Sequence, residues 1–385
     1  MSPLDVPRPA WMTEDVVLLE EQARRFIDAE FVPHLDRWNE AGMYEREVWT
    51  KAGAAGLLCA SMPEEYGGAG GSFAHEVAIN RALSLAGFDA FGGPLHSGIV
   101  APYILHYGTD EQKRRWLPRL ATGELVAAIA MTEPGAGSDL QAVRTRAVRH
   151  GNGYVLNGAK TFISNGQHAN LVVVVAKTDP AAGAKGISLM VVETDEVQGF
   201  RRGRKLKKLG FDAADTSELF FDEVKLPPEN LLGPEEGQGF AQLMDDLPRE
   251  RLIVTVHAQA MIERALGLTI EYVKQRQAFG KKIIEFQNTQ FVLAECKSEA
   301  TVARVFHDYC IARYLEGGLD TVTASMAKYW LTDLQGRIID RCLQLFGGYG
   351  YMEEFPISRM YRDARVMRIY AGTNEIMKLL IARSL

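Results

Sequence analysis

The sequence predicts an α+β protein in which a central antiparallel β domain separates two helical domains. Apolar residues recur at helical spacing up to about residue 124, short β-branched runs follow, and helical spacing returns from about residue 238. At 385 residues, the chain is long enough for two or three domains of about 150 residues each. We therefore expect helical domains over residues 1–124 and 238–385 and a β domain over 125–237.

The N-terminal region is typical of helices joined by glycine- and proline-rich loops. The apolar face of one predicted helix consists of Leu18, Leu19, Gln22, Ala23, Phe26 and Ile27. Pro63, the glycine cluster at 67–71 and the GGP segment at 92–94 indicate loops between helices. No strand precedes the cluster at 67–71, so we expect a plain loop rather than a phosphate-binding loop.

Short apolar segments predict strands in the central region. Residues 126–131 and 171–176 are strand-like, and residues 187–192 and 217–224 have the same character. The basic stretch at 201–208 could be an anion patch. The interleaved Leu206 and Leu209 favour a strand with one solvated face instead.

One hairpin is predicted from a dipeptide. Asn157-Gly158 is flanked by strand-like residues at 154–156 and 160–162. A type I′ turn needs two positive φ angles, which Asn and Gly tolerate best. We therefore expect the chain to reverse direction at Asn157-Gly158.

The C-terminal region predicts long helices that pack as a bundle. Their apolar stripes consist of Ala258, Met261, Ile262, Ala265, Leu268 and Tyr272, and of Leu293, Cys296, Ala300, Ala303 and Cys310. Pro248 suits the first position of a helix, where a missing N–H has no intrahelical partner. Glu250 would then lie in the first turn, where a carboxylate stabilises the positive end of the helix dipole. Taken alone, that role is favoured over a general base.

Composition excludes several classes of protein. The chain has 43 basic and 49 acidic residues, a net charge of −6, which does not suggest a nucleic-acid-binding protein. No apolar run approaches the roughly 18 residues of a membrane span, and residues 1–5 lack the features of a secretion signal. The four cysteines have no metal-type spacing, and the histidines form no HExxH motif, so no metal site is expected. We expect a cytoplasmic protein with buried, reduced cysteines.

Glycine-rich segments could approach a ligand. Residues 132–139 (TEPGAGSD) follow a predicted strand and combine two glycines with two hydroxyl side chains. A simple β turn is at least as good an interpretation of that segment alone. Glycines at 347–350 and at 372 are likewise typical of turns that connect helices.

Taken together, these segments resemble the acyl-CoA dehydrogenase family along nearly the whole chain. The matching segments, in order, are residues 131–140 (MTEPGAGSDL), 162–166 (FISNG), 276–280 (RQAFG), 344–350 (QLFGGYG), 362–364 (RDA) and 372–383 (GTNEIMKLLIAR). Other segments look closest to the long-chain branch, namely residues 96–100 (HSGIV), 247–252 (LPRERL), 272–276 (YVKQR) and 325–330 (SMAKYW). The family fold is an N-terminal helical domain, a central β domain and a C-terminal four-helix bundle.

The resemblance implies that FAD binds between the β domain and the C-terminal helices. The positions that match flavin and pyrophosphate contacts are Ile129, Met131, Thr132, Gly137 and Ser138. Phe162 and Ser164 stand where the family usually has Trp and Thr beside the isoalloxazine, and Thr373 and Glu375 would meet the same cofactor. The positions that match contacts to the FAD of a neighbouring subunit are Arg276, Phe279, Gln287, Gln344 and Gly348. A homo-oligomer, usually a tetramer, is therefore implied.

One departure from the family pattern concerns the catalytic base. Many members carry it as the Glu of a YEGT motif, where this chain has Ala371. Isovaleryl-type and long-chain-type members carry it on the first long C-terminal helix, just before an Arg, and Glu250 followed by Arg251 matches that place. The resemblance therefore overrides the helix-dipole interpretation and makes Glu250 the expected base.

The implied reaction is the α,β-dehydrogenation of an acyl-CoA to a trans-2-enoyl-CoA. Glu250 would remove the α proton, with its pKa raised by an apolar pocket, while hydride passes to flavin N5. The Ala371 N–H and an FAD ribityl hydroxyl would bind the thioester carbonyl. Ser138, Arg251 and Gly372 would also contact the substrate. An electron-transfer flavoprotein is the implied electron acceptor.

Two other functions are alternatives to this dehydrogenase reaction. A relative with the same fold could act as a flavin monooxygenase or nitroalkane oxidase. With Ala371 taken as a dead site, the chain could instead be a non-catalytic acyl-CoA-binding scaffold. The long-chain-like segments favour long acyl chains, although branched or steroid-side-chain thioesters stay open.

Overall fold

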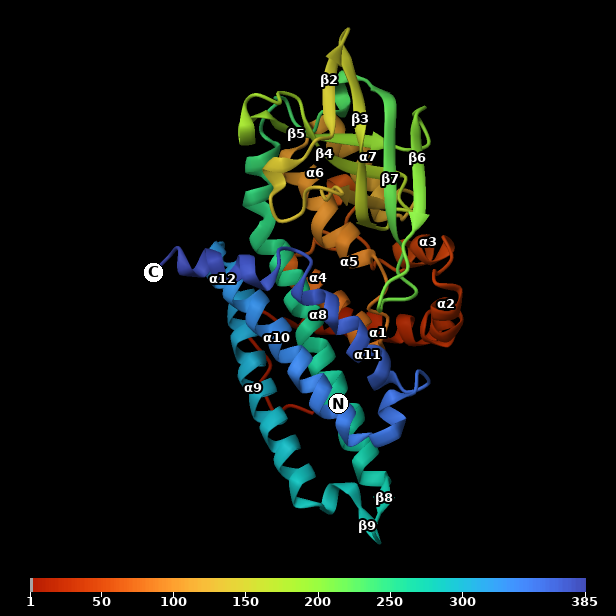
Figure 1. Ribbon diagram of the computed structural model, residues 1–385, viewed down its shortest axis with the longest axis vertical. Coiled ribbons are helices and arrows are strands. Elements are labelled where there is room, and N and C mark those ends of the chain that lie inside the picture. Colours follow the sequence, from red (N-terminus) through yellow and green to blue (C-terminus); the bar gives the residue numbers. More distant parts are fainter. Residues whose placement is uncertain (1–2) are drawn as a thin grey trace.

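The computed structural model describes residues 3–385, so the first two residues of the N-terminal segment lie outside it. The N-terminal helices are α1 (Glu14–Glu30), α2 (Leu35–Ala41), α3 (Glu47–Ala54), α4 (Phe73–Ala86), α5 (Gly93–Leu95), α6 (Ala101–Tyr107) and α7 (Asp110–Ala121). The strands are β1 (Ala127–Ala130), β2 (Arg146–His150), β3 (Gly153–Ser164), β4 (Leu171–Lys177), β5 (Ile187–Glu193), β6 (Phe200–Lys205) and β7 (Thr216–Leu226). The C-terminal helices are α8 (Gly239–Gln275), α9 (Gln287–Leu315), α10 (Thr321–Leu345), α11 (Pro356–Ala364) and α12 (Asn374–Ala382), with the short strands β8 (Gln277–Ala278) and β9 (Lys281–Lys282) between α8 and α9. The predicted α+β order is confirmed, and Figure 1 shows the large sheet at one end of the molecule and β8–β9 at the other.

Helix α1 has a buried face that differs slightly from the predicted one. Val16, Glu20, Ala23 and Ile27 are buried. Leu18, which was expected on the apolar face, is 59% exposed. Leu18 is two residues from both Val16 and Glu20, a spacing that places it on the other side of the helix.

The large sheet is mostly antiparallel but mixed. Its order is β1-β4-β2-β3-β7-β6, and β5 pairs with β4. Strand β1 runs parallel to β4, in contrast to the antiparallel pairing that was expected of the β domain. The basic stretch is a strand only as far as Lys205, and Leu209 lies beyond the strand and is exposed.

The predicted hairpin at Asn157-Gly158 is wrong, because both residues lie inside strand β3. The chain reverses earlier, between His150 and Gly153, which pair across the ends of β2 and β3. At Gly158 the pairing with β7 shifts register. A Cβ atom on Gly158 would lie 2.3 Å from Oγ1 of Thr145, so the glycine is needed for close packing rather than for a turn.

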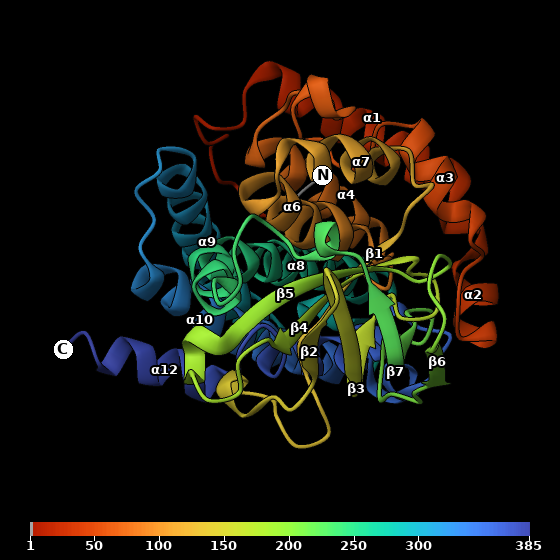
Figure 2. The same ribbon diagram turned by 90° about the horizontal axis from the view of Figure 1, so that it is seen from above.

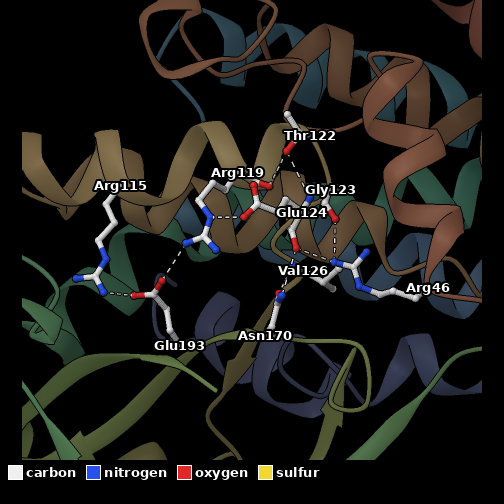
Figure 3. Close-up of polar contacts among 9 residues, drawn as sticks. All are labelled: Arg46, Arg115, Arg119, Thr122, Gly123, Glu124, Val126, Asn170 and Glu193. Carbon is white, nitrogen blue, oxygen red and sulfur yellow. Dashed lines mark hydrogen bonds and ion pairs between the residues drawn. The ribbon is translucent and has the colours of Figure 1, made fainter. Parts of the chain in front are cut away.

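A polar network fixes the segment between α7 and β1 (Figure 3). The guanidinium of Arg46 donates to the carbonyl oxygens of Gly123 and Glu124, at 2.9 and 2.8 Å. Asn170, just before β4, accepts from the N–H of Val126 at 2.7 Å and donates to the carbonyl of Glu124 at 3.2 Å. The start of β1 is therefore held by side chains from both the helices and the sheet.

The same network joins helix α7 to strand β5. Arg119 donates to Glu193 at 3.1 Å, and Arg115 forms an ion pair with the same carboxylate. Glu193 is nearly buried, so this pairing is screened less than a surface ion pair. These contacts anchor β1, which leads directly into the glycine-rich segment at 132–139.

Helix α8 begins at Gly239, so the predicted helix start at Pro248 is wrong. Pro248 lies inside the helix, where its fixed φ is compatible with helical geometry although one backbone hydrogen bond is lost. The turns before it are retained because residues such as Leu243 are buried in the core. Glu250 therefore lies far from the first turn of a 37-residue helix and cannot stabilise its N-terminal end.

Helix α8 is also the centre of the molecule. It packs against α4, α6, α9, α10, α11 and β5. Figure 2, which looks along the long axis, shows it between the N-terminal helices and the remaining C-terminal helices. Every residue from 249 to 263 is buried, as expected of a helix that is covered on all sides.

The predicted apolar stripes and buried cysteines are confirmed. Ala258, Met261, Ile262 and Ala265 are buried on α8, and Leu268 and Tyr272 are half-buried against the same core. Leu293, Cys296, Ala300, Ala303 and Cys310 are buried on α9. All four cysteines are free and buried. Across residues 3–385, no helix is both long and apolar enough to cross a membrane.

Adding one methyl group at Gly158 should destabilise the fold. Gly158→Ala forces a Cβ against the buried side chain of Thr145, and we expect a loss of about 1–3 kcal/mol in the free energy of unfolding. Gly267→Ala is the matched control, because a Cβ there meets no atom within 4 Å and alanine favours a helix. Urea unfolding of both variants checks this, and equal effects of the two substitutions would contradict it.

Candidate active site

The segments expected to contact the flavin meet where β1 and β3 end. The N–H of Thr161 donates to the carbonyl of Thr132 at 2.9 Å, which joins the two segments directly. Figure 1 shows the β2–β3 turn at the far tip of the sheet, so β3 runs from there toward the helices. The structure therefore brings Met131 and Thr132 close to Phe162 and Ser164.

A buried ion pair braces this junction. The ammonium of Lys160, whose side chain is fully buried, donates to the carbonyl of Met131 at 3.0 Å and to Glu133 at 2.9 Å. Glu133 also accepts from the N–H groups of Arg144 and Thr145. Burial lowers the pKa of Lys160 to about 8, although the carboxylate beside it opposes this shift. The pair fixes the backbone around Met131 without occupying the exposed side of the loop.

The end of β3 is both strained and open. Phe162 has a φ of +59°, an uncommon value for a bulky residue, and its ring is 67% exposed. Ser164 is also exposed, as are Gly137 and Ser138 in the neighbouring loop. An exposed ring next to free hydroxyl groups is a surface that a large planar polar ligand could cover.

The segment 371–375 follows the last 3-10 turn and continues into the first turn of α12. Ala371 and Gly372 both have positive φ angles, of 51° and 83°. Thr373 caps α12, accepting from the N–H of Ile376, and Glu375 is exposed on the first turn. The carbonyl of Gly372 accepts from Lys328 at 2.7 Å, so the loop is tied to helix α10.

Lys328 is an unusual buried lysine. Its side chain is inaccessible, and its hydrogen-bond acceptors are two neutral groups, the Gly372 carbonyl and Oδ1 of Asn374 at 3.0 Å. Desolvation, followed by the charge of Arg251, lowers the pKa of Lys328 to about 7. Asn374 is held in turn by Thr332 and Asp333. The network makes the unusual backbone of this loop rigid.

Glu250 is buried near the middle of the molecule. It is 5% exposed, and its Oε1 accepts from the hydroxyl of Tyr103 on α6 at 2.6 Å. Desolvation raises the pKa of Glu250 to about 7, with a contribution from Asp246, while Tyr103 and Arg251 act in the opposite direction. A carboxyl group with this pKa can accept a proton near neutral pH.

Arg251 connects Glu250 with the loop at 371–375. Its Nη1 donates to Oγ of Ser325 at 3.1 Å, and its buried Nε has no hydrogen-bond partner among residues 3–385. Ser325 lies one turn before Lys328 on α10. A chain of contacts therefore runs from Arg251 through α10 to Gly372.

The five positions expected to serve a neighbouring subunit lie elsewhere. They are Arg276, Phe279, Gln287, Gln344 and Gly348, and all are exposed. Arg276 stacks over Tyr349 at 5.5 Å, which places the α8–α9 and α10–α11 connections together. Figure 1 shows β8–β9 at the opposite end of the molecule from the large sheet. Within one chain, β8–β9 therefore lies far from the end of β3 that carries Phe162.

Some residues near the candidate site could not be identified from local sequence patterns. Tyr103 contacts Glu250 across 147 positions of sequence, and no motif contains it. Lys160 lies two residues before the FISNG segment, and its role depends on Glu133. Lys328 and Asn374 do lie in family-like segments, SMAKYW and GTNEIMKLLIAR. Lys328 also stands on an otherwise apolar helical stripe, and this is a signal by which it could have been found.

Three family models match consecutive parts of the chain. They are the N-terminal, middle and C-terminal domains of acyl-CoA dehydrogenase, over residues 13–124, 128–224 and 237–385. The chain belongs to the acyl-CoA dehydrogenase family. It is therefore an enzyme of the flavoprotein oxidoreductase class to which this family belongs.

Relatives of known name support this membership over the full length. The chain is 48% identical over 370 residues to the mitochondrial long-chain specific acyl-CoA dehydrogenase of Mus musculus, covering 96% of this chain and 86% of that protein. The crystal structure of acyl-CoA dehydrogenase from Geobacillus kaustophilus has a TM-score of 0.95 and 49% identity, covering 98% and 99% of the two chains. A glutaryl-CoA dehydrogenase from Mycobacterium smegmatis in complex with FADH2 has a TM-score of 0.90 and 29% identity, covering 97% and 95%.

Removing the Lys328 ammonium should loosen the loop at 371–375. Lys328→Met leaves the Gly372 carbonyl and the Asn374 side chain without this donor, and we expect a cost of about 1–3 kcal/mol with faster amide exchange at 371–374. Lys274→Met, at an exposed position on α8, should change neither quantity measurably. Hydrogen exchange measured by mass spectrometry checks both variants. Native exchange rates in Lys328→Met would contradict the assigned role.

Proposed function

We propose that the protein catalyses the FAD-dependent α,β-dehydrogenation of an acyl-CoA to a trans-2-enoyl-CoA, with Glu250 as the base. The observation that carries the proposal is the burial of Glu250 together with its raised pKa. This residue is a buried carboxyl group whose pKa is raised to about 7, on a chain that has Ala at position 371. The long-chain name of the mouse relative supports long acyl chains as the substrate class.

The residues at the ends of β1 and β3 fit FAD. Ile129, Met131, Thr132, Gly137 and Ser138 would hold the flavin and pyrophosphate, together with Phe162, Ser164, Thr373 and Glu375. An added Cβ at Gly135 or Gly137 would meet no atom within 4 Å, so the backbone of this loop is open to a ligand. The FADH2 complex of the Mycobacterium smegmatis glutaryl-CoA dehydrogenase supports the same cofactor. When bound, FAD supplies the acceptor for the hydride that leaves the β carbon.

The protein's own groups would lower the barrier to removal of the α proton. The N–H of Ala371 would donate to the thioester carbonyl oxygen, where negative charge develops as the proton leaves. Glu250 would take that proton, since its desolvated carboxylate is more basic than one in water. Arg251, Ser138 and Gly372 would help to hold the thioester. Water exclusion by the buried helix α8 strengthens these electrostatic effects.

A second copy of the chain would complete the cofactor site. Arg276 and Phe279 flank strand β8, which Figure 1 shows at the opposite end of the molecule from the large sheet, and Arg276 stacks over Tyr349, next to Gly348. These residues, with Gln287 and Gln344, could reach FAD bound to a neighbour. Phe291, Val302, Val305 and Tyr309 on α9 are each more than half exposed, which supports a covering partner. We propose a homo-oligomer, with a tetramer as the expected form. An electron-transfer flavoprotein is the proposed electron acceptor, and a cytoplasmic location stays a prediction.

Glu250→Gln should abolish most activity while FAD stays bound. A panel of straight and branched acyl-CoA thioesters with a dye acceptor should show a loss of about 100-fold or more, the scale of a positioned general base. Turnover by the native protein should rise with pH through about pH 7, because Glu250 must be deprotonated to act. Glu271→Gln, on an exposed part of the same helix, is the control.

Three outcomes would contradict the proposal. Comparable turnover in Glu250→Gln would reject that residue as the base. Stoichiometric oxygen uptake with a hydroxylated product would indicate a monooxygenase. A colourless protein that cannot be reconstituted with flavin would indicate a scaffold.

Arg276→Ala should weaken the retention of FAD. The planar guanidinium can donate two parallel hydrogen bonds to one phosphate group. We propose that Arg276 does so across a subunit boundary. Flavin absorbance after extensive dialysis measures retention, with Lys274→Ala as a control for a nearby exposed charge. Unchanged flavin affinity together with an unchanged oligomeric state would count against a shared site.

A further inference from the structure

Helices α6 and α8 are joined by two polar contacts, one above the other. The hydroxyl of Tyr103 donates to Oε1 of Glu250 at 2.6 Å, and Nδ1 of His106 lies 3.0 Å from Oδ1 of Asp246. Tyr103 and His106 are three positions apart on α6, and Asp246 and Glu250 are four positions apart on α8. Both pairs therefore lie on facing sides of their helices.

The Tyr103 contact is rigid and short. Tyr103 is fully buried in the core formed by α6, α7 and the sheet, so its ring has little freedom to move. A distance of 2.6 Å is typical of a hydroxyl that donates to a charged carboxylate. Burial and the Glu250 charge raise the pKa of Tyr103 well above its usual value, so the hydroxyl keeps its proton.

The two oxygens of Glu250 differ in their surroundings. Oε1 is held by Tyr103, whereas Oε2 has no hydrogen-bond partner among residues 3–385. A carboxylate held by one oxygen cannot rotate freely about its last bond. The free oxygen therefore keeps a defined direction and is the one available to accept a proton.

We propose that Tyr103 is a positioning residue for proton transfer, which anchors Oε1 of Glu250 and leaves Oε2 to receive the α proton. This inference rests on the proposed function of Glu250. The α C–H bond breaks, and its proton forms a new O–H bond at Oε2, while its electron pair enters the α,β double bond as the hydride leaves the β carbon. Oε1 becomes the carbonyl oxygen of the neutral acid and still accepts from Tyr103, so no proton passes through the tyrosine.

Tyr103 also determines how easily Glu250 ionises. Desolvation and Asp246 favour the neutral acid, whereas the Tyr103 hydrogen bond and Arg251 favour the carboxylate. The titratable or charged groups around this site are Tyr103, His106 and Tyr107 on α6, Asp246, Arg249 and Arg251 on α8, Tyr314 on α9 and Lys328 on α10. Of these, Tyr103 makes the one direct hydrogen bond to Glu250 that the described residues contain.

Tyr103→Phe tests the proposal, because it removes the hydroxyl and keeps the ring. The holoenzyme would be assayed with palmitoyl-CoA and a dye acceptor over a range of pH. We expect the acidic limb of the kcat profile to move up by about one pH unit, which is about a tenfold loss of kcat below that limb. KM should change less than kcat. Tyr154→Phe, which removes another tyrosine–glutamate hydrogen bond of 2.7 Å at the opposite end of β3 from Phe162, should leave the profile unchanged.

A double variant separates positioning from a general structural role. With Glu250→Gln already present, Tyr103→Phe should cause no further loss of the residual rate, because there is no carboxylate left to hold. An equal loss in both backgrounds would overturn the proposal. So would a Tyr103→Phe enzyme with native kcat and a native acidic limb.

A third variant tests whether the effect of Tyr103→Phe comes from the hydrogen bond or from altered packing. Incorporation of 3-fluorotyrosine at position 103 keeps the size and makes the hydroxyl a stronger donor, so the acidic limb should move to lower pH, opposite to Tyr103→Phe. A limb that does not move, or moves upward, would overturn the proposal. If Glu250→Gln is itself fully active, the proposed function fails. If Glu250→Gln is inactive and Tyr103→Phe is native, the role of Tyr103 alone fails.

Discussion

The burial of a carboxyl group in the central helix is the constraint on which the rest of the site depends. Glu250 has lost its hydration, so it must either stay neutral or find partners that replace water. Tyr103 supplies one such partner from α6, and Arg251 supplies a nearby positive charge that is itself held by α10. The helices on both sides of α8 must therefore be correctly placed before Glu250 can have a pKa near neutrality.

Two buried lysines extend the same principle to the loops around the site. Lys160 holds the carbonyl of Met131 and Lys328 holds the carbonyl of Gly372, at 3.0 and 2.7 Å. In both cases desolvation lowers the pKa of the lysine. An ammonium below a loop fixes its backbone while the outer surface stays free. Rigid loops of this kind allow a backbone N–H, such as that of Ala371, to act as a pre-oriented donor.

The length of the C-terminal helices also constrains how copies of the chain can associate. They carry Arg276 and Phe279 to the end of the molecule farthest from the sheet, and Phe279 is 95% exposed there. Among residues 3–385, the contacts of the aromatic and cationic side chains at this tip are the stacking of Arg276 on Tyr349 and the contacts of Phe286 with Phe279 and Lys281. A symmetric oligomer would place them against another copy, because every contact is then repeated on both chains.

The sequence by itself determined the order of helical and β regions, the buried stripes of α8 and α9, and the absence of an acidic side chain at position 371, which makes Glu250 the candidate base. These properties depend on local periodicity or on motifs of a few residues. Only the tertiary structure decided that Asn157-Gly158 lies inside a strand, that α8 starts before Pro248, and that Tyr103 meets Glu250. Each of these outcomes depends on contacts with residues elsewhere in the sequence, such as that of Gly158 with Thr145 or that of Glu250 with Tyr103. Tertiary packing outweighs a local turn or helix-start preference, and it cannot be derived from spacing along the chain.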